Sequence, residues 1–519
     1  MLTPTNYYLN GELGRKLTVT IQIALYDKIN SFAGLAYFEN PAFYDQIQLA
    51  QQGAQSAATK ALSNLTTMFQ QIITLLSFLG ALLAFQPLLA ALLLLAVLPN
   101  LYAEIKLGRH RVSMMADISP KRRYKSFFGM LLSGHRSAKE VRLFGLGSYF
   151  LHRLRSYLQE IHSAERIQQK REMIWQAGLG VLSSVVSSGA YVLVIIAAFS
   201  EQLSLGDIML YIGAITSVQA GLNRLMIVLA SMNESALFFT HYDALMGMSS
   251  DISMLSPHVS VKPLTTKIEL RGVSFRYSDK HPWVLRNVNL LIPAGQCLAL
   301  VGLNGAGKTT LVKLLARLYD PTEGEILWDG VDIRQFEVDT LRQHIGVIFQ
   351  DFMRYDLTVQ ENIGLGDVAH IDNLPRVRKA ARQAGIHEAI EATPNGYETP
   401  LGFLFTDRGY GVDMSGGQWQ KLATARLFMR QRADLLILDE PTAALDAQAE
   451  YEMYSHFAEL VAGRTSVLIS HRFSTVRMAD KIAVLEGGEI TEHGAHDELL
   501  SLGGIYAKLY RMQAEKYSV

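Results

Sequence analysis

Residues 297–315 have the sequence CLALVGLNGAGKTTLVKLL, and this stretch decides the fold of the C-terminal half. Five apolar residues typical of a buried strand lead into a glycine-rich loop, and a helix-favouring segment follows at once. In such a loop the glycines let backbone N–H groups wrap phosphates, while a lysine reaches the terminal phosphates and a hydroxyl can ligate Mg²⁺. The motif in this strand-loop-helix context predicts a nucleotide-binding α/β domain with the P-loop NTPase fold.

The loop itself is the first candidate site, and we expect it to bind ATP. Lys308 is expected to contact the terminal phosphates and Thr309 to ligate Mg²⁺. The full set of candidate loop residues is Gly302, Leu303, Asn304, Gly305, Ala306, Gly307, Lys308, Thr309 and Thr310.

Two later apolar runs also end in residues that suit nucleotide chemistry. The run 435–438 ends in Asp439 and Glu440, and the run 466–470 is followed by His471. A carboxylate at a strand end can hold hydrated Mg²⁺, and the next can polarise the attacking water. We expect Asp439 to hold the metal, Glu440 to act on water and His471 to contact the γ-phosphate. Taken alone, an acidic pair or a histidine after a strand is an ordinary structural feature.

Composition separates the chain from several classes of protein. The 519 residues are 49% hydrophobic and 18% charged, with a mean hydropathy of +0.14, which is apolar for a soluble protein. The balance of 48 basic and 48 acidic residues gives no global field for nucleic acid, so none is expected as a partner. The only cysteine, Cys297, allows no internal disulfide and fits a reducing compartment.

The N-terminal half carries long apolar stretches that predict a helical membrane domain. A bilayer core needs about 20 helical residues, and four stretches qualify, near residues 68–85, 88–102, 175–199 and 208–229. The alternative, buried helices of a large soluble protein, fits poorly because residues 65–102 carry no charge at all and exceed the length of an ordinary core helix. Basic residues crowd positions 106–125, which places that long helical loop in the cytoplasm by the positive-inside rule.

The predicted organisation is therefore multidomain. We expect an all-α transmembrane domain over residues 1–250, a linker over 251–266 and an α/β nucleotide-binding domain over 267–519. The linker is polar and contains two prolines, which break regular structure. The protein is expected in the cytoplasmic membrane, in contact with lipid, with the nucleotide-binding domain on the cytoplasmic side.

One further motif resembles a known family. Residues 414–418, MSGGQ, resemble the signature of ATP-binding cassette (ABC) transporters, with Met414 where leucine is usual. The resemblance covers nearly the whole chain and implies that Tyr277 stacks on adenine and that Gln350 senses Mg²⁺ and the membrane domain. It also implies that residues 443–446 communicate across a dimer and that His471 is the switch histidine. The implied ATP contacts of the signature are Ser415, Gly416, Gly417 and Gln418.

The resemblance also implies partners and a mechanism. In this family two cassettes close head to tail over ATP and Mg²⁺, so a second cassette subunit is expected. A homodimer is favoured because all catalytic residue types are retained, and a heterodimer is the alternative. The chain is similar to exporters of the half-transporter type, which implies ATP-driven export of a substrate by alternating access. Residues 39–45 and 133–145 would then lie near the loops that press on the cassettes.

The family resemblance leaves three matters open. Family members usually have six spans, so this chain is expected to lack the first two. Residues 416–421, GGQWQK, resemble bacterial peptide and lantibiotic exporters, although lipids and drugs are also possible cargo. Two alternative functions are a membrane-bound ABC ATPase with a signalling or partner-dependent role and a soluble-type ABC ATPase.

Overall fold

The structure is a computed structural model that describes residues 2–85, 87, 91, 98–199, 204–402, 411–440, 461, 463–470 and 473–517. The chain divides into two compact units. The helical unit comprises Met1–Ser31 and Phe38–Ser249, and the α/β unit comprises Phe32–Tyr37 and Ser250–Val519.

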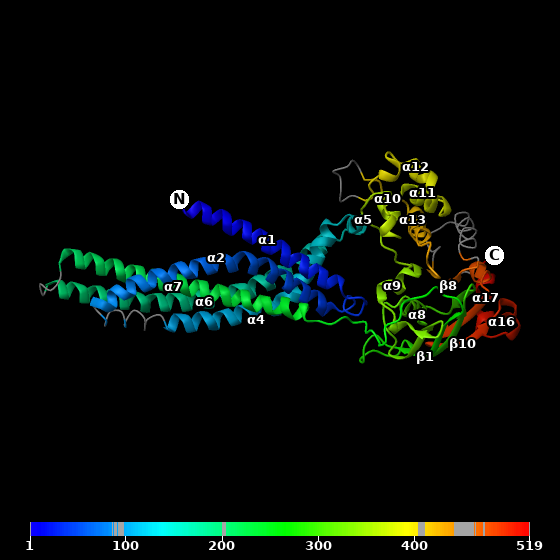
Figure 1. Cartoon of the computed structure of the whole chain (residues 1–519), viewed down its shortest axis with the longest axis horizontal. Helices are drawn as coiled ribbons and strands as arrows, with labels where there is room; N and C mark the ends of the chain where they lie inside the picture. The colour runs from blue at the N-terminus through cyan, green and yellow to red at the C-terminus, as the bar shows by residue number, and fades with distance from the viewer. Residues whose placement is uncertain are drawn as a thin grey trace. The chain divides into compact units, whose positions relative to one another are not determined.

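Long helices build the helical unit, where α2 packs along α7 and α4 along α6 (Figure 1). The helices are α1 (Leu2–Asn30), α2 (Pro41–Phe85), α4 (Leu98–Ser133), α5 (His135–Leu143), α6 (Gly147–Phe199) and α7 (Leu205–Met246). With 53 residues, α6 is about 80 Å long. It can therefore cross a bilayer and still extend well beyond it.

Three stretches among the described residues are long and apolar enough to cross a membrane. They are Ser63–Leu83, Gly147–Ile196 and Gly206–Asn233. Their most apolar windows are 17%, 17% and 39% buried, respectively, so most of their apolar surface faces outward. The span expected at 88–102 lies largely outside the described residues, and α4 begins at Leu98.

Local sequence fixes the start of α7. The Ser204 hydroxyl accepts a hydrogen bond from the Asp207 N–H at 3.3 Å, and the Asp207 carboxylate accepts one from the Ser204 N–H at 2.9 Å. This capping box satisfies two donors at the helix N-terminus. Further along, buried α7 residues such as Ile215 and Val218 pack against Leu82 of α2, which gives this unit an apolar core of its own.

The α/β unit contains two sheets. A four-stranded antiparallel sheet has the order β2-β1-β4-β5, and a six-stranded sheet has the order β10-β9-β3-β8-β7-β6, with only the β10 and β9 pair antiparallel. The strands are β1 (Lys267–Phe275), β2 (Leu285–Pro293), β3 (Cys297–Val301), β4 (Glu323–Trp328), β5 (Val331–Asp332), β6 (Ile345–Ile348), β7 (Leu435–Asp439), β8 (Thr465–Ile469), β9 (Lys481–Glu486) and β10 (Glu489–Gly494).

Helices complete this unit. They are α8 (Lys308–Leu315), α9 (Val338–Gln343), α10 (Val359–Gly364), α11 (Leu374–Gln383), α12 (His387–Glu391), α13 (Gly416–Met429), α15 (Phe473–Val476), α16 (His496–Leu502) and α17 (Ile505–Tyr517). Three 3₁₀ turns are η1 (Ile333–Gln335), η2 (Val368–His370) and η3 (Gly396–Glu398).

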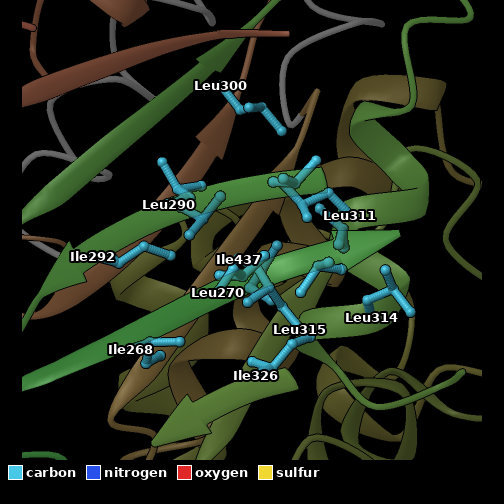
Figure 2. Packing of buried hydrophobic residues seen from close by; sticks show 14 of the residues in the cluster. Ile268, Leu270, Leu290, Ile292, Leu300, Leu311, Leu314, Leu315, Ile326 and Ile437 are labelled. Atoms are coloured by element: carbon cyan, nitrogen blue, oxygen red, sulfur yellow. The ribbon is translucent and has the colours of Figure 1, made fainter. Parts of the chain in front are cut away.

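Both sheets and α8 share one apolar core. Figure 2 shows Leu270 and Ile326 of the antiparallel sheet, Leu311 of α8 and Ile437 of β7 in the same cluster. A second cluster joins α10, α11 and α13 around Trp419, which is 2% exposed. Apolar burial stabilises by about 25 cal/mol per Å². The two clusters therefore hold together the strands and helices that flank the candidate loops.

A short piece of the N-terminal half belongs to the α/β unit. Residues Phe32–Tyr37, which lie between α1 and α2, cluster with it, although residues 1–250 are expected to form the membrane domain. The Leu35 N–H donates to the Leu318 carbonyl at 3.0 Å, and the Leu35 side chain packs against the core. The docked piece precedes the expected contact region 39–45, whereas α5, within 133–145, stays in the helical unit.

Candidate functional site

The parallel sheet brings the candidate residues together. Strands β3, β6, β7 and β8 are parallel, with Ile348 opposite Leu438 and Asp439 opposite Ile469. Their carboxyl ends therefore lie at one edge of the sheet, which we call the carboxyl edge. The phosphate loop follows β3, Gln350 follows β6, and Glu440 follows β7. Ligands of open α/β sheets bind at this kind of edge.

The phosphate loop requires glycine at two positions. A Cβ at Gly302 would collide with the Leu485 carbonyl oxygen, so only glycine fits there. Gly307, the residue before α8, has φ +106°, a conformation that other residues rarely adopt. These positions set the loop so that backbone N–H groups at the start of α8 can face an anion.

Lys308 is held inside this loop. It is 7% exposed, and its Nζ donates to the carbonyls of Gly302 at 2.8 Å and Leu303 at 3.1 Å. Burial lowers the pKa of this ammonium group, and the negative charges of Glu440 and Asp439 act against that shift. The lysine thus occupies the centre of the loop, where the terminal phosphates of a bound nucleotide would lie.

Two polar side chains, those of Gln350 and Glu440, meet next to the loop. Gln350 Nε2 donates to a Glu440 carboxylate oxygen at 2.9 Å. Glu440 has φ +47°, a left-handed conformation that is unusual outside glycine and that sets the direction of its carboxylate. Strained backbone of this kind is often found at functional sites.

Asp439 is the most buried of these groups, at 1% exposure. Burial is the main cause that raises its pKa to about 6, and a hydrogen bond from the Thr309 side chain acts in the opposite direction. Its Oδ2 is buried and forms no hydrogen bond within the described part of the chain. A buried carboxylate oxygen without a donor needs a cation, so the residues fit Mg²⁺.

The ligand set also agrees with this metal. Thr309, Gln350 and Asp439 supply oxygens, which Mg²⁺ prefers, and Mg²⁺ usually takes only one or two carboxylates and fills its shell with phosphates and water.

Tyr277 lies beside the loop with its ring fixed by neighbours. Its hydroxyl is 3.0 Å from the Thr310 hydroxyl, and its ring centroid is 5.0 Å from that of Phe275 and 5.4 Å from that of Tyr319. The side chain is 36% exposed, so one part of the ring remains open to solvent. An aromatic ring held in this way can stack on a nucleotide base.

The signature residues start helix α13. The Ser415 hydroxyl accepts from the Gln418 N–H at 3.3 Å, and Gln418 Oε1 accepts from the Ser415 N–H at 2.9 Å. This capping box leaves the N–H groups of Gly416 and Gly417 without a hydrogen bond to any described residue. Ser415 is exposed, so the helix start can receive an anion from outside the unit.

Two sets of predicted residues cannot be placed. His471 and residues 443–446 lie outside the described residues. Their roles stay predictions from the resemblance.

The structure adds a pocket that sequence reasoning missed. It has a volume of about 270 Å³ and lies on the α/β unit next to β6. Apolar residues such as Leu318 and Phe349 line it together with the arginines Arg342, Arg426 and Arg430. No motif marks these residues, because they come from separate helices and strands and share neither spacing nor residue type.

Comparisons with known proteins show what the chain resembles. The sequence model of the family described as ABC transporter matches residues 285–443. The subtilin transport ATP-binding protein SpaT of Bacillus subtilis is 29% identical over 516 residues, which are 98% of this chain and 82% of the relative.

Two ATP-dependent lipid A-core flippases match part of the chain. That of Methylococcus capsulatus is 37% identical over 66% of this chain and 57% of its own length. That of Syntrophus aciditrophicus is 43% identical over 50% of this chain and 42% of its own length. The chain thus spans only about half of each of these two relatives.

A solved structure matches nearly the whole fold. A bacterial Atm1-family ABC exporter with ATP bound has a TM-score of 0.86 and 24% identity, covering 97% of this chain and 86% of that one. The fold is therefore that of an exporter, with a helical membrane domain before an ATPase domain. The family match identifies residues 285–443 as an ABC transporter cassette, and the similarity over nearly the whole chain identifies a multi-pass membrane protein that fuses this cassette to the membrane domain of an ATP-driven exporter.

Proposed function

We propose that the carboxyl edge hydrolyses ATP with Glu440 as the base that polarises the attacking water. The observation that carries this proposal is the convergence of Lys308, Asp439, Glu440 and Gln350 at one edge, with Gln350 bonded to Glu440 at 2.9 Å. A carboxylate beside a phosphate loop is correctly placed to accept a proton from water. Lys308 would neutralise charge on the terminal phosphates.

The proposed metal is Mg²⁺, held by Thr309, Gln350 and Asp439. Bound there, it would neutralise negative charge on the β- and γ-phosphates. Asp439 would supply the anionic ligand, and the protein groups would orient the phosphates toward Glu440. The unpaired buried oxygen of Asp439 supports this assignment. Tyr277 would hold adenine, because its ring is partly open beside the loop.

We further propose a homodimer in which each ATP lies between two copies. One copy would supply the phosphate loop, and the other would supply the exposed start of α13 at Ser415, Gly416 and Gly417. These N–H groups have no partner among the described residues, and the positive end of a helix favours phosphate. His471 would contact the γ-phosphate, as the resemblance implies.

The pocket beside β6 offers a second place where two copies could touch. At the end of α5, Leu143 and Phe144 are 78% and 66% exposed. Two adjacent exposed apolar side chains at a helix end can pack against an apolar surface of a partner. We propose that this end of α5 lies against the partner's pocket, whose apolar residues would cover it.

The proposed cargo is a peptide, exported across the cytoplasmic membrane with the cassettes on the cytoplasmic side. SpaT, which aligns over nearly the whole chain, is a subtilin transport protein, and this supports the peptide class. Closure of the cassettes on ATP would move the spans between inward-facing and outward-facing states.

The test uses the full chain in inside-out vesicles with labelled subtilin as the probe. The proposal predicts that subtilin stimulates ATP hydrolysis and accumulates inside the vesicles with Mg²⁺-ATP but not with Mg²⁺-ADP. Hydrolysis without accumulation or stimulation would contradict the peptide assignment and favour a membrane ATPase without transport. A labelled phospholipid in the same assay tests lipid as the alternative cargo. Stimulation and transport with the phospholipid but not with subtilin would favour lipid.

A further inference from the structure

The turn between α1 and α2 is bound to the α/β unit through its backbone. The N–H groups of Gly34 and Ala36 donate to the two carboxylate oxygens of Asp251 at 2.9 and 3.1 Å. Arg342 Nη2 donates to the Ala33 carbonyl at 2.6 Å, and the Leu35 N–H is bonded as described above. Residues 33–36, which we call the docked turn, are therefore bonded at every position.

Asp251 belongs to the linker that follows α7, so it connects two separate parts of the chain. Residues 250–256 form neither helix nor strand. The linker is nevertheless attached to the α/β unit at the next residues, because the Ser253 N–H donates to Asp320 at 3.2 Å and the Ser253 carbonyl accepts from Arg317 at 3.0 Å. Ile252, which lies between Asp251 and Ser253, is 6% exposed. Asp251 thus extends from an anchored piece of linker.

Two arginines join this anchor to the docked turn. Arg317 is fully buried, and its Nη1 donates to the Phe336 carbonyl at 2.6 Å. Arg342 Nη2, which holds Ala33, also donates to the Arg317 carbonyl at 2.7 Å. Arg317 is costly to release from its carbonyl partners, since each lost bond leaves a buried polar group unpaired, and the partly buried Arg342 loses two carbonyl bonds if it moves. Arg317 and Arg342 therefore give the docked turn a fixed attachment to the α/β unit.

Gly34 shows how closely the carboxylate fits. It is buried, and a Cβ at this position would collide with the Asp251 carboxylate. Glycine here therefore allows the carboxylate to reach the backbone N–H groups. The contact can be broken from either side, by removing the carboxylate or by adding a methyl group to Gly34.

We propose that Asp251 is a positioning residue for coupling, which ties the docked turn to the linker. This proposal rests on the proposed ATP-driven movement of the membrane helices. The linker is the covalent connection from the cassette to α7, and the docked turn is a second connection, to α1 and α2. A linker without regular structure transmits displacement poorly, whereas two connections bonded to each other move together. Asp251 therefore makes α7 and the pair of α1 and α2 follow the cassette together.

The experiment compares Asp251→Ala and Gly34→Ala with the unchanged chain in nanodiscs, and Asp279→Ala, an exposed carboxylate, is the control. Spin labels on Phe199→Cys, at the exposed end of α6, report the distance between the two subunits with and without Mg²⁺-ATP and vanadate. Cys297 is buried and can stay. Hydrolysis is measured in the same samples as kcat and KM.

The proposal predicts that KM for ATP stays within about twofold in every variant, because none of these residues touches the carboxyl edge. The ATP-driven distance change should fall by at least half in Asp251→Ala and Gly34→Ala. Asp251→Asn, which retains one acceptor oxygen, should restore part of it, and Asp279→Ala should leave it intact. A full distance change in Asp251→Ala would overturn the proposal.

A second readout covers variants that fold poorly. Hydrogen exchange of residues 33–36 should speed up in Asp251→Asn, since the Ala36 or Gly34 N–H loses its acceptor. Unchanged exchange would show that the hydrogen bonds from the docked turn to Asp251 are absent in solution and would overturn the proposal. If the unchanged chain hydrolyses ATP without any distance change, the proposed function fails as well, and this result is distinct from failure of the variants alone.

Discussion

The α/β unit and the helical unit bury their apolar residues to very different extents. Every residue of β3, β7 and β8 is buried, whereas the membrane-crossing windows of the helical unit are only 17–39% buried. The α/β unit therefore carries its own core and builds its chemistry from its own residues. The helical unit presents its apolar surface outward and needs lipid and neighbouring helices to cover it.

The difference teaches where each kind of change should act. A substitution at the carboxyl edge should alter nucleotide chemistry and leave the membrane helices as they are. The following predictions test this separation, beginning with the largest expected effect.

Glu440→Gln should lower steady-state ATP hydrolysis by at least about 100-fold, because the amide cannot accept a proton from water. ATP affinity should stay unchanged, since the phosphate loop is not altered. Radiolabelled ATP binding and phosphate release measure the two effects on the full chain. Glu489→Gln, an exposed carboxylate on β10, is the matched control and should keep full activity. Undiminished hydrolysis in Glu440→Gln would remove the proposed base.

Asp439→Asn should stabilise the nucleotide-free chain at neutral pH. Burial raises the pKa of Asp439 from 3.8 to about 6, so the folded state binds a proton that the unfolded state has released between these values. Stability therefore falls as pH rises from about 4 to 6, by on the order of 3 kcal/mol. Thermal melting in nanodiscs should show that the advantage of Asp439→Asn grows over this pH range.

The same variant should lose the stabilisation that Mg²⁺-ATP gives to the unchanged chain, because an amide replaces the anionic metal ligand. Melting with and without Mg²⁺ at pH 7 measures this loss. A variant that melts like the unchanged chain at every pH and retains the Mg²⁺ effect would contradict the metal assignment.

Lys308→Ala should weaken ATP binding by roughly tenfold or more, the range expected for losing charge-assisted hydrogen bonds. Equilibrium binding of a fluorescent ATP analogue provides the measurement. Lys379→Ala removes an exposed lysine of α11 and should bind normally. Equal affinity in the two variants would exclude the phosphate role of Lys308.

Tyr277→Ala should raise KM for ATP by a few-fold, as expected for the loss of one aromatic stacking contact worth about 1 kcal/mol. Tyr277→Phe keeps the ring and loses only the hydrogen bond to Thr310, so KM should change by less than about twofold. The order of the two variants is the informative result, and a larger effect in Tyr277→Phe would argue against base stacking.

Sequence reasoning found its candidate site residues where the signal is local. The phosphate loop, Asp439 with Glu440, and the signature residues Ser415 and Gln418 all lie within a few residues of a strand or helix end. Their residue types determine the local backbone and the chemistry together. The ABC cassette, implied by the signature motif, and the exporter fold, implied by a membrane domain placed before the cassette, were both confirmed.

The docked turn and the pocket beside β6 could not be predicted in this way. Gly34 and Ala36 bind Asp251 through backbone N–H groups, which every residue except proline has, so no residue pattern marks the contact. The partners are 215 and 217 positions apart. Likewise, Arg342 resembles any charged residue on a short helix until its two carbonyl partners are known.

Native mass spectrometry of the Glu440→Gln variant in nanodiscs can count both chains and nucleotides. It is the most direct test of ATP bound between two copies, because this variant should trap uncleaved ATP. We expect Mg²⁺-ATP to give a complex of two chains that retains two ATP molecules. A single chain that retains ATP, or a pair that binds none, would contradict the account.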